Sequence, residues 1–319
     1  MLKRACVIGG MSATGIVWIV TLGNLLLPTQ RELVMLAGLR AVLLLAATAA
    51  FLSLLHASPR WSIAALVLML YHGGGIASYS IPEAHTLSAN PRLKILYANV
   101  DRPSHSWDAL RIIVEEFDPD IFIADEVDEI WQPQMAWADS TYPHRVASWD
   151  GYGMAIYSRL PIEDSTVITE PGRFGKTIPV KCEWQGTRFR IYATHINSPV
   201  DDAGFLKQAR QFDTVARTVK GFPEETFIAG DMNACETRLE FRTLLSDCRL
   251  RDSRSGFGWQ ASWPFGWPVL SIPLDHILVP EGWQVVDRRL GPFYGSDHRP
   301  VLLTVTRDGD MESGTQDGI

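Results

Sequence analysis

Long apolar runs fill the first 88 residues of the chain. Residues 5–27, 34–57 and 61–81 each approach the ~20 residues that cross a bilayer as a helix. Three glycines at 73–75 interrupt the last of these runs. Lys3 and Arg4 precede the first run, as in a signal peptide. That run is long for one, however, no Ala-x-Ala pattern follows it, and further apolar runs do. The pattern predicts about three transmembrane helices within residues 1–88.

After a short polar link that ends at Pro91, the pattern changes to shorter segments. Apolar runs of strand length alternate with amphipathic ones: strands are expected within 93–100, 120–127, 153–162, 177–184, 187–196, 225–233, 274–279 and 300–305, and helices within 106–118, 202–219 and 236–247. Many strands with few helices indicate an α/β fold in which two sheets pack together with helices outside. This domain covers residues 89–306, and the Gly- and Asp-rich residues 307–319 are predicted to be a disordered tail.

Charge divides the chain in the same way. Five of the 29 Lys and Arg residues and two of the 36 acidic residues lie in residues 1–88. The remainder therefore holds 24 basic and 34 acidic residues, a net charge of about −10. A protein that follows a nucleic-acid backbone normally presents a basic face, so this balance disfavours nucleic acid as a partner. It allows a small phosphorylated substrate held by a metal ion.

The four cysteines show no CxxC pair and no Cys/His cluster with zinc spacing, so a structural metal is not expected. A disulfide between Cys235 and Cys248 is the one pairing worth testing. The segment between them has helical spacing, and eight or nine helical residues would hold the two cysteines roughly 13 Å apart. A disulfide tolerates only about 7 Å between Cα atoms, so both thiols are expected to be free.

Polar residues that bind metals or transfer protons stand at the ends of most predicted strands. A single one is typical of a strand end that meets solvent, but a series at the open end of a sheet indicates a convergent site. The last pair lies between Gly295 and Pro300, where an irregular backbone can present two neighbouring side chains to one site. The residues are Asn99, Asp101, Glu126, His195, Asp231, Asn233, Asp275, Asp297 and His298.

The motifs that carry these residues resemble those of the endonuclease/exonuclease/phosphatase (DNase I-like) superfamily. They appear in the family's order: "ANVD" at 98–101, "ADEV" at 124–127, "GMAIYSRLPI" at 153–162, "ATHINSP" at 193–199, "GDMN" at 230–233, "LDHI" at 274–277 and "SDHRP" at 296–300. The resemblance covers residues 92–306. It implies a four-layer α/β/β/α sandwich, a divalent cation that is usually Mg²⁺ with Mn²⁺ as a second possibility, and hydrolysis of a phosphoester.

The resemblance also implies roles for the individual residues. It makes Glu126 the main metal ligand, with Asn99 and Asp297 as further members of the metal site. It makes His298 the general base and Asp275 the carboxylate that orients it. The same comparison implies that Asp231 and Asn233 position the nucleophile and stabilise charge, and that His195 donates to a phosphoryl oxygen.

Two positions differ between branches of that family. Asp125 stands where members often have Gln, so it is expected either to be a second ligand or to point into solvent. Asp101 is similar to an acid of the apurinic-endonuclease branch, whereas residues 194–199 are more similar to the phosphatase and phospholipase branches. The motifs therefore leave the subfamily open.

Residues that could recognise the substrate give a weaker signal. Arg173 and Lys176 could meet a phosphate group. Residues 259–267, "WQASWPFGW", could rest on a membrane interface or hold a lipid, although the pattern favours Trp263 as a core residue beneath the sheet.

Together these features favour a membrane-anchored, metal-dependent phosphoesterase whose substrate is lipid-linked or close to the membrane. The alternatives are a nuclease held at the membrane and a catalytically idle binding module, and the complete set of polar residues argues against the latter. Lys3 and Arg4 place the N-terminus inside the cell, so three spans would put the domain outside a multi-pass cell membrane. Arg60 agrees with this orientation, whereas Arg31 and Arg40 disagree.

Overall fold

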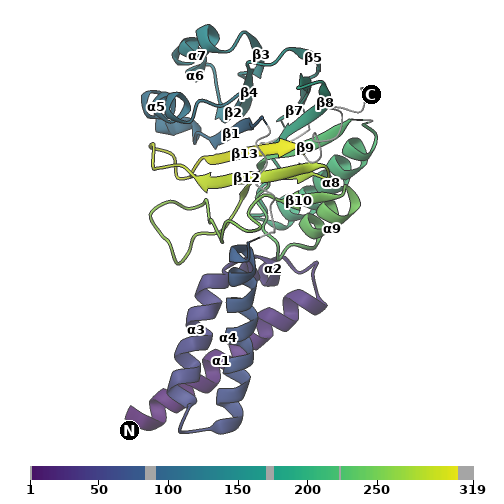
Figure 1. Cartoon of the computed structure of the whole chain (residues 1–319). Helices are drawn as coiled ribbons and strands as arrows, with labels where there is room; N and C mark the ends of the chain where they lie inside the picture. Colours follow the sequence, from purple (N-terminus) through teal and green to yellow (C-terminus); the bar gives the residue numbers. More distant parts are fainter. Residues whose placement is uncertain (1, 83–90, 170–175, 223, 308–319) are drawn as a thin grey trace, which may run out of the picture.

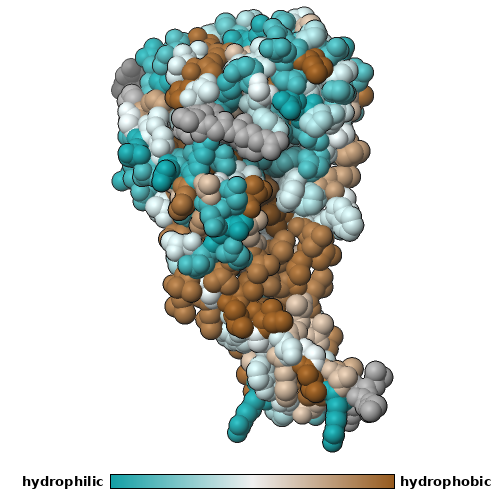
Figure 2. Space-filling model, turned by 180° about the vertical axis from the view of Figure 1, so that it is seen from behind, coloured by the Kyte–Doolittle hydropathy of each residue, from teal (hydrophilic) through white to brown (hydrophobic). Residues whose placement is uncertain are grey.

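The computed structural model describes residues 2–82, 91–169, 176–222 and 224–307. A bundle of helices at the N-terminus carries an α/β domain at one end, and the N-terminus lies at the other end of the bundle (Figure 1). Apolar side chains cover the bundle, whereas the domain surface is mostly hydrophilic (Figure 2). The predicted tail lies outside the described residues, except that Arg307 ends the last strand and pairs with Glu225.

The N-terminal region contains four helices: α1 (Leu2–Leu26), α2 (Arg31–Gly38), α3 (Arg40–Leu54) and α4 (Pro59–Ala77), followed by the short turn η1 (Ser78–Ser80). Two helices are long and apolar enough to cross a membrane, Arg4–Leu26 and Pro59–Ser80. These correspond to the first and third predicted spans. The second predicted span, over 34–57, is not confirmed as a single helix: α2 and α3 meet at 76°, and they make a third span only if the bent pair is counted as one.

The break between α2 and α3 lies at Leu39, whose φ of −77° and ψ of 49° are not helical. An apolar run gives no sign of such a bend, because both helices are apolar. The three glycines, in contrast, do not interrupt α4. A Cβ atom at Gly75 would lie within 2 Å of the Arg40 guanidinium, and one at Gly73 would lie 3.4 Å from Leu44. These glycines therefore allow α3 and the Arg40 side chain to approach α4 closely.

Two β-sheets form the centre of the domain. One has the strand order β12-β13-β1-β2-β4-β3 and the other β10-β11-β9-β8-β7-β5, with β6 also paired to β7. The strands are β1 (Leu93–Asn99), β2 (Ile121–Val127), β3 (His144–Ser148), β4 (Gly153–Ser158), β5 (Ile162–Ser165), β6 (Ile168–Thr169), β7 (Lys176–Trp184), β8 (Thr187–Thr194), β9 (Glu225–Asp231), β10 (Leu250–Asp252), β11 (Asp275–Pro280), β12 (Trp283–Leu290) and β13 (Val301–Arg307).

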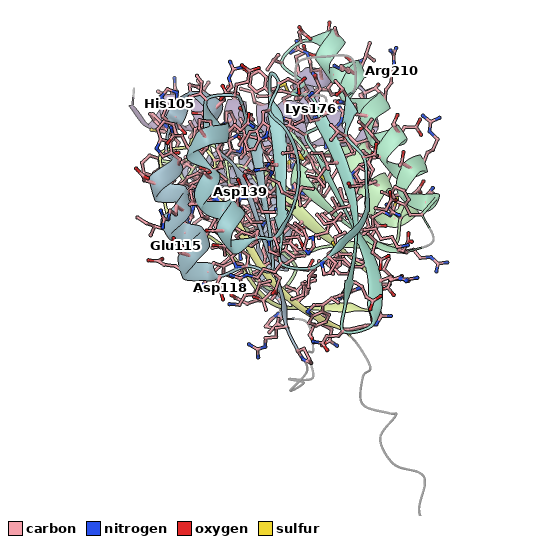
Figure 3. All side chains as sticks on the ribbon, turned by 90° about the horizontal axis from the view of Figure 1, so that it is seen from above. His105, Glu115, Asp118, Asp139, Lys176 and Arg210 are labelled. Carbon is pink, nitrogen blue, oxygen red and sulfur yellow. The ribbon has the colours of Figure 1, made fainter. Side chains whose placement is uncertain are left out.

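Helices cover the outer face of each sheet. The turn η2 (Arg102–Ser104) and helices α5 (Trp107–Phe117), α6 (Trp131–Gln134) and α7 (Ala136–Thr141) accompany the first sheet, and α8 (Asp202–Lys220) and α9 (Leu239–Asp247) pack on the second. Seen from above, the helices that carry Glu115 and Asp139 lie on one side of the sheets, and the helix that carries Arg210 lies on the other (Figure 3). This is the four-layer α/β/β/α sandwich that the motifs predicted.

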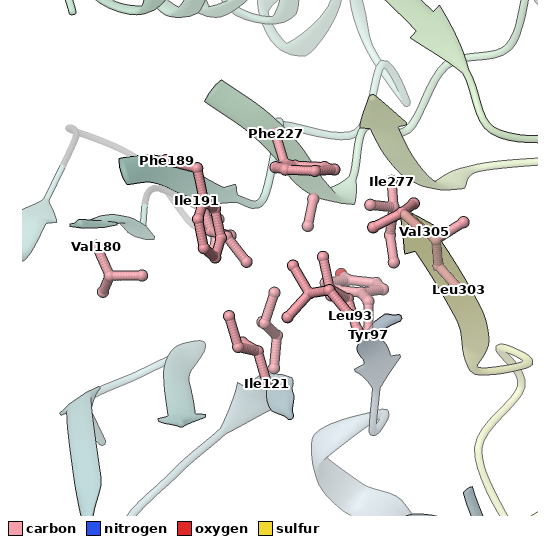
Figure 4. Close-up of a cluster of buried hydrophobic side chains, with 14 of the residues drawn as sticks. Leu93, Tyr97, Ile121, Val180, Phe189, Ile191, Phe227, Ile277, Leu303 and Val305 are labelled. Carbon is pink, nitrogen blue, oxygen red and sulfur yellow. The ribbon is translucent and has the colours of Figure 1, made fainter. Parts of the chain in front are cut away.

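The main core lies between the two sheets. Leu93, Tyr97 and Ile121 of the first sheet meet Phe189 and Phe227 of the second, and all five are fully buried (Figure 4). Strands buried on both faces are continuous apolar runs, which explains why most of them were predicted. Strands β3, β5, β6, β10 and β12 were not, because they are short or interrupted by charged residues.

Candidate active site

Strand register brings the predicted polar residues to one edge of the sandwich. β1 and β2 are parallel, so Asn99 stands beside Asp125 at their carboxyl ends. β9 and β11 are antiparallel, so the last residue of β9, Asp231, pairs with the first residue of β11, Asp275. The segment before β13 supplies His298 from the first sheet. Asp231 and His298 line one cavity together with Glu126, His195 and Asn233. Asn99, Asp125 and Asp275 do not line it but contact residues that do.

Glu126 reaches this cavity through an irregular backbone. The pairing of β2 with β4 shifts register between Asp125 and Val127, and Glu126 has a φ of +61° in the left-handed region. A β-bulge of this kind redirects a side chain that would otherwise follow the alternation of the strand. Asn99 donates from Nδ2 to Oε1 of Glu126 at 3.0 Å and to Asp231 at 3.3 Å. Asn99 thus holds both carboxylates in place.

His298 and Asp275 form a hydrogen-bonded pair. Nδ1 of His298 lies 2.8 Å from Oδ2 of Asp275, and both side chains are buried. The other ring nitrogen, Nε2, lies 3.8 Å from the carboxylate of Asp231. A carboxylate on one imidazole nitrogen fixes the orientation of the ring and leaves the second nitrogen to act on a substrate or on water. The structure therefore supports the predicted partnership of these two residues.

Asp231 and Asn233 are fixed by the loop that follows β9. The backbone amide of Asn233, whose φ is +46°, donates to Oδ1 of Asp231 at 2.8 Å. The side-chain amide of Asn233 donates to the carbonyl of Ile196 at 2.9 Å and lies 3.3 Å from Nε2 of His195. Nε2 of His195 lies 3.8 Å from Asp231, so this histidine faces the same position as His298.

Asp125 is neither exposed nor directed at the cavity. It is fully buried, its carboxylate lies 2.9 Å from Nδ1 of His195, and it accepts a hydrogen bond from the Tyr97 hydroxyl at 2.5 Å. The Tyr97 hydroxyl in turn accepts the backbone N–H of Asp231 at 2.7 Å. Asp125 thus orients His195 as Asp275 orients His298. Tyr97, an inward-facing residue of an apolar strand, gave no sequence signal of this role.

Asp297 lies at the rim of the cavity. Half of its side chain is exposed, and its carboxylate lies 3.9 Å from Nε2 of His298. The indole Nε1 of Trp263 donates to Oδ2 of Asp297 at 2.8 Å, and Trp263 itself lines the cavity. The sequence pattern favoured Trp263 as a core residue beneath the sheet, and this is wrong. Trp263 lines the cavity and positions Asp297.

The two predicted basic residues do not join this cluster. The ammonium group of Lys176 is buried and binds Asp150 at 2.7 Å and Thr169 at 3.3 Å. Lys176 does not line the cavity, so its geometry gives no support to a contact with phosphate. Arg173 lies outside the described residues. The predicted absence of a disulfide is confirmed, since Cys235 and Cys248 are both free and α9 separates them.

The buried carboxylates repel one another and are costly to ionise. Burial raises the pKa of Glu126. Burial, together with the adjacent Asp275 carboxylate, raises the pKa of Asp231 to about 7. At the rim, burial and the nearby Asp297 raise the pKa of Asp101. A positive charge among these groups would offset the repulsion.

The two histidines show the opposite response. Burial disfavours the charged form of His298, but the Asp275 carboxylate outweighs it and raises the pKa of His298 to about 10. Burial likewise opposes charge on His195, and Asp125 overcomes it and raises the pKa of that ring to about 9. Protons on His298 and His195 therefore supply the positive charge that balances the buried carboxylates. A bound metal ion could supply that positive charge instead.

The donor set fits a hard divalent cation. Two groups bring their ligand atoms within 4.8 Å of one another: Glu126, His195 and Asp231, and Asp231, Asp275 and His298. Asp275 Oδ1 is buried and has no hydrogen-bond partner among the described residues. Mg²⁺ binds one or two carboxylates and completes its shell with water and phosphate oxygens. The carboxylates of Glu126 and Asp231, which line the cavity, meet that requirement.

Comparison with known proteins agrees with this geometry. Residues 96–298 match the Endonuclease/Exonuclease/phosphatase family. A search of curated proteins gives no match. Among solved structures, a humanized TDP2 from D. rerio has a TM-score of 0.58 and 17% identity over 67% of this chain and 99% of its own. A 3′ phosphatase from Neisseria bound to product DNA has a TM-score of 0.53 and 20% identity over 68% of this chain and all of its own.

Sphingomyelinase C from Streptomyces griseocarneus has a TM-score of 0.50 and 19% identity over 67% of this chain and 99% of its own. At these identities the likeness shows the fold alone. The family match spans well over half of the chain, and the chain belongs to the endonuclease/exonuclease/phosphatase family. It is thus a metal-dependent hydrolase of phosphate esters.

Proposed function

We propose that this enzyme hydrolyses a phosphoester carried by a lipid or another amphiphile at the membrane surface. The observation that carries the proposal is an exposed apolar loop beside the site. Phe265, Trp267, Val269 and Leu270 are each at least 39% exposed, and the indole of the neighbouring Trp263 holds Asp297. Aromatic residues of this kind favour the headgroup region of a bilayer.

The apolar loop lies at the end of the domain that meets the helical bundle (Figure 1). Earlier in the segment that leads to this loop, Gly258 donates its amide to the carbonyl of Tyr79 in η1, the turn that follows α4, at 2.8 Å. Phe265 also stacks on exposed Phe293, with ring centroids 4.5 Å apart, which enlarges the apolar surface. A surface continuous with helices of spanning length would rest on the same bilayer.

In the proposed mechanism Glu126 would be the main ligand of a divalent cation. Asn99 would orient the Glu126 carboxylate, and Asp297 would be a further member of the metal site at the rim of the cavity. A bound cation would polarise a phosphoryl oxygen and neutralise negative charge on the phosphate. His298 would be neutral once a bound cation takes over the positive charge that its proton supplies, and the ring would then accept the proton of the attacking water through Nε2, supported by Asp275 on Nδ1. Asp231, 3.8 Å from that nitrogen, positions the same water. His195 and Asn233 donate to the phosphoryl group.

A membrane-held nuclease is the second candidate, because solved structures with this fold include one bound to a DNA product. The net charge of about −10 on residues 89–319 argues against binding a long polyanion. A catalytically idle module is disfavoured because the complete set of residues converges with hydrogen-bonded geometry.

We also propose that the protein is a multi-pass protein of the cell membrane with its domain outside. The N-terminus and the α3–α4 turn lie at the end of the bundle away from the domain (Figure 1). Arg31 and Arg40, whose positions disagreed with this orientation, are ion-paired with domain residues Asp202 and Glu236. Their positive charge is thus compensated, which leaves Arg4 and Arg60 at the opposite end.

The test is a substrate panel with the full-length enzyme in detergent. The panel contains phospholipids, isoprenyl phosphates and plasmid DNA, each with Mg²⁺ and with EDTA, and His298→Ala is the inactive control. We expect EDTA-sensitive hydrolysis of a lipid phosphoester. Plasmid hydrolysis far faster than that of any lipid would establish the nuclease instead.

A further inference from the structure

The cavity that holds the catalytic residues does not end at them. It has a volume of about 300 Å³, within the usual range for ligand sites, and it extends to the N-terminal region. Helix α2 supplies part of its wall through Val34, Met35 and Gly38. A wall contributed by the membrane region is not needed for the chemistry, since every catalytic group comes from the domain.

The part of the cavity near α2 is apolar. We call it the α2 chamber and define it by the side chains Val34, Met35, Val200, Phe205, Ile272 and Leu274. At its edge, Met35 and Val200 are 44% and 72% exposed. The chamber therefore joins the charged catalytic groups to an apolar surface at the head of the bundle.

Several contacts fix α2 in this position. Arg31 binds Asp202 at 2.9 Å and the carbonyl of Val200 at 2.8 Å. At the other end of the helix, a Cβ atom on Gly38 would meet the Cys235 thiol at 3.4 Å, so the helix lies directly on the loop that follows Asn233. Asn24 of α1 donates to the carbonyl of Thr237 in the same loop at 3.3 Å.

We propose that the α2 chamber binds the hydrocarbon chain of the substrate next to its phosphate. This inference rests on the proposed function. A phosphate at the metal-binding carboxylates would allow an attached chain to extend along the apolar wall of the same cavity that α2 helps to form. A water-soluble ester would leave this apolar wall exposed, whereas each methylene of an alkyl chain gains free energy by entering it.

The experiment uses full-length enzyme in one detergent and esters that differ only in chain length. Ethyl, octyl and dodecyl phosphates are supplied both as monoesters and as 4-nitrophenyl diesters. We expect kcat/KM to rise about two- to fourfold per buried methylene until the chamber is full. The measured quantity is the ratio of kcat/KM for the dodecyl ester to that for the ethyl ester.

Two neighbouring positions of α2 provide a matched pair of variants. Met35 lines the chamber, whereas Leu36, which is 46% exposed, does not. Met35→Asp should lower the dodecyl-to-ethyl ratio at least tenfold, and Leu36→Asp should leave it unchanged. Met35→Trp, which fills the chamber without adding charge, is a second variant. Both Asp variants are assayed in the same detergent, so partition of the ester into micelles affects their dodecyl-to-ethyl ratios equally.

The outcomes separate the two claims. A ratio near one in the wild type, or an equal change in both Asp variants, would overturn the chamber while ethyl ester hydrolysis still upheld the phosphoesterase. If no ester of either type were cleaved above the EDTA control, the proposed function itself would fail. A drop confined to Met35→Asp and Met35→Trp would establish the α2 chamber as the chain-binding site.

Discussion

At the scale of single residues, two carboxylate–histidine pairs face one position. Asp275 holds His298, and Asp125 holds His195, with Asp231 3.8 Å from a ring nitrogen of each. Each pair comes from two different strands or loops, so only the closed fold creates it. The arrangement separates residues that hold the cation from residues that handle protons, and substitutions can test that separation.

We expect Asp275→Asn to lower kcat on the order of 10²–10⁴-fold, because the imidazole of His298 loses the partner that fixes its orientation. The Mg²⁺ concentration for half-maximal activity should change little. Steady-state kinetics over a Mg²⁺ titration measure both quantities, with the exposed Glu281→Gln as control. A kcat within a few-fold of the wild type would remove Asp275 from the mechanism.

Glu126→Gln should show the converse pattern. The neutral amide keeps the shape of the side chain but is a poorer ligand for a hard cation. The half-maximal Mg²⁺ concentration should rise at least tenfold, and isothermal titration without substrate should show weaker binding. An unchanged metal titration would show that Glu126 is not the ligand.

A third residue-scale prediction concerns stability. His276 is fully buried, its Nε2 lies 2.9 Å from the carbonyl of Ala234, and burial lowers its pKa from 6.5 to about 4. The unfolded chain therefore takes up a proton between pH 6.5 and 4 that the folded chain does not. This residue's contribution is complete above pH 6.5 and falls by roughly 3 kcal/mol as the pH drops to 4.

Chemical denaturation of the wild type and His276→Gln between pH 4 and 7 checks this sign. The glutamine keeps a donor for the Ala234 carbonyl but cannot be protonated. The difference between the two free energies of unfolding should therefore change with pH across this window. Parallel curves would mean that His276 does not titrate on unfolding.

At the scale of elements, the junction between bundle and domain is formed by buried charges. Arg40 of α3 binds Glu236 at 2.6 Å, and the side chains are only 11% and 14% exposed. Glu236 also meets Arg254, which is fully buried and paired with Asp252 at 2.6 Å. Glu236 follows the catalytic "GDMN" motif by three residues, so this junction supports the loop that carries Asn233.

We expect Arg40→Met to destabilise the protein by about 2–4 kcal/mol, because it leaves the Glu236 carboxylate buried without this partner. Arg31→Met is the matched control on the preceding helix. Its partners Glu32 and Asp202 are 65% and 86% exposed, so its loss should cost no more than about 1 kcal/mol. Thermal unfolding in the same detergent compares the two, and equal shifts would contradict the assignment.

Comparison of the observed elements with the predicted ones shows which of them could be predicted from the sequence. Strands β1, β2, β9 and β13 were predicted because strands buried on both faces are continuous apolar runs. The bend at Leu39 was not, since an apolar run looks the same whether it is straight or bent. The edge strand β12 was missed because charged residues interrupt it, among them Arg288, which is buried only in the folded structure.

The site shows the same division. Residues at strand ends, such as Asp231 and His298, could be found because their types and order are informative. Asp125 and Tyr97 could not be assigned, because their role depends on partners that the fold brings from other strands. Trp263 was misplaced for a related reason: an indole packs in cores and also donates a hydrogen bond, and only the contact with Asp297 distinguishes the two.

At the scale of the whole molecule, orientation follows from the arrangement of the helices. The bundle starts at the end away from the domain, and the turn between α3 and α4 returns to that end (Figure 1). If α2 and α3 together complete a crossing, the chain passes three times and the domain lies opposite the N-terminus. Arg31 and Arg40, at the end of the bundle next to the domain, are ion-paired with Asp202 and Glu236 of the domain.

We expect alkaline phosphatase fused to the C-terminus to be active and a fluorescent protein fused there to be dark, since the former requires export and the latter fails to mature after it. Fusions placed after residue 57, in the turn before α4, should give the reverse result. Matching results at both positions would contradict the crossing of α4. The reverse result at the C-terminus would place the site on the cytoplasmic side.

The left-handed backbone at Glu126 and Asn233 has a consequence for how this protein can change. A glycine would adopt a φ of +61° or +46° with less strain than either residue does, so folding alone favours its replacement. The Asn233 amide also donates to the Ile196 carbonyl at 2.9 Å, whereas only hydrolysis requires the Glu126 carboxylate. A lineage or a laboratory selection that rewards stability without demanding turnover would thus drift toward glycine at Glu126 first. The enzyme would lose its activity through changes that improve its backbone.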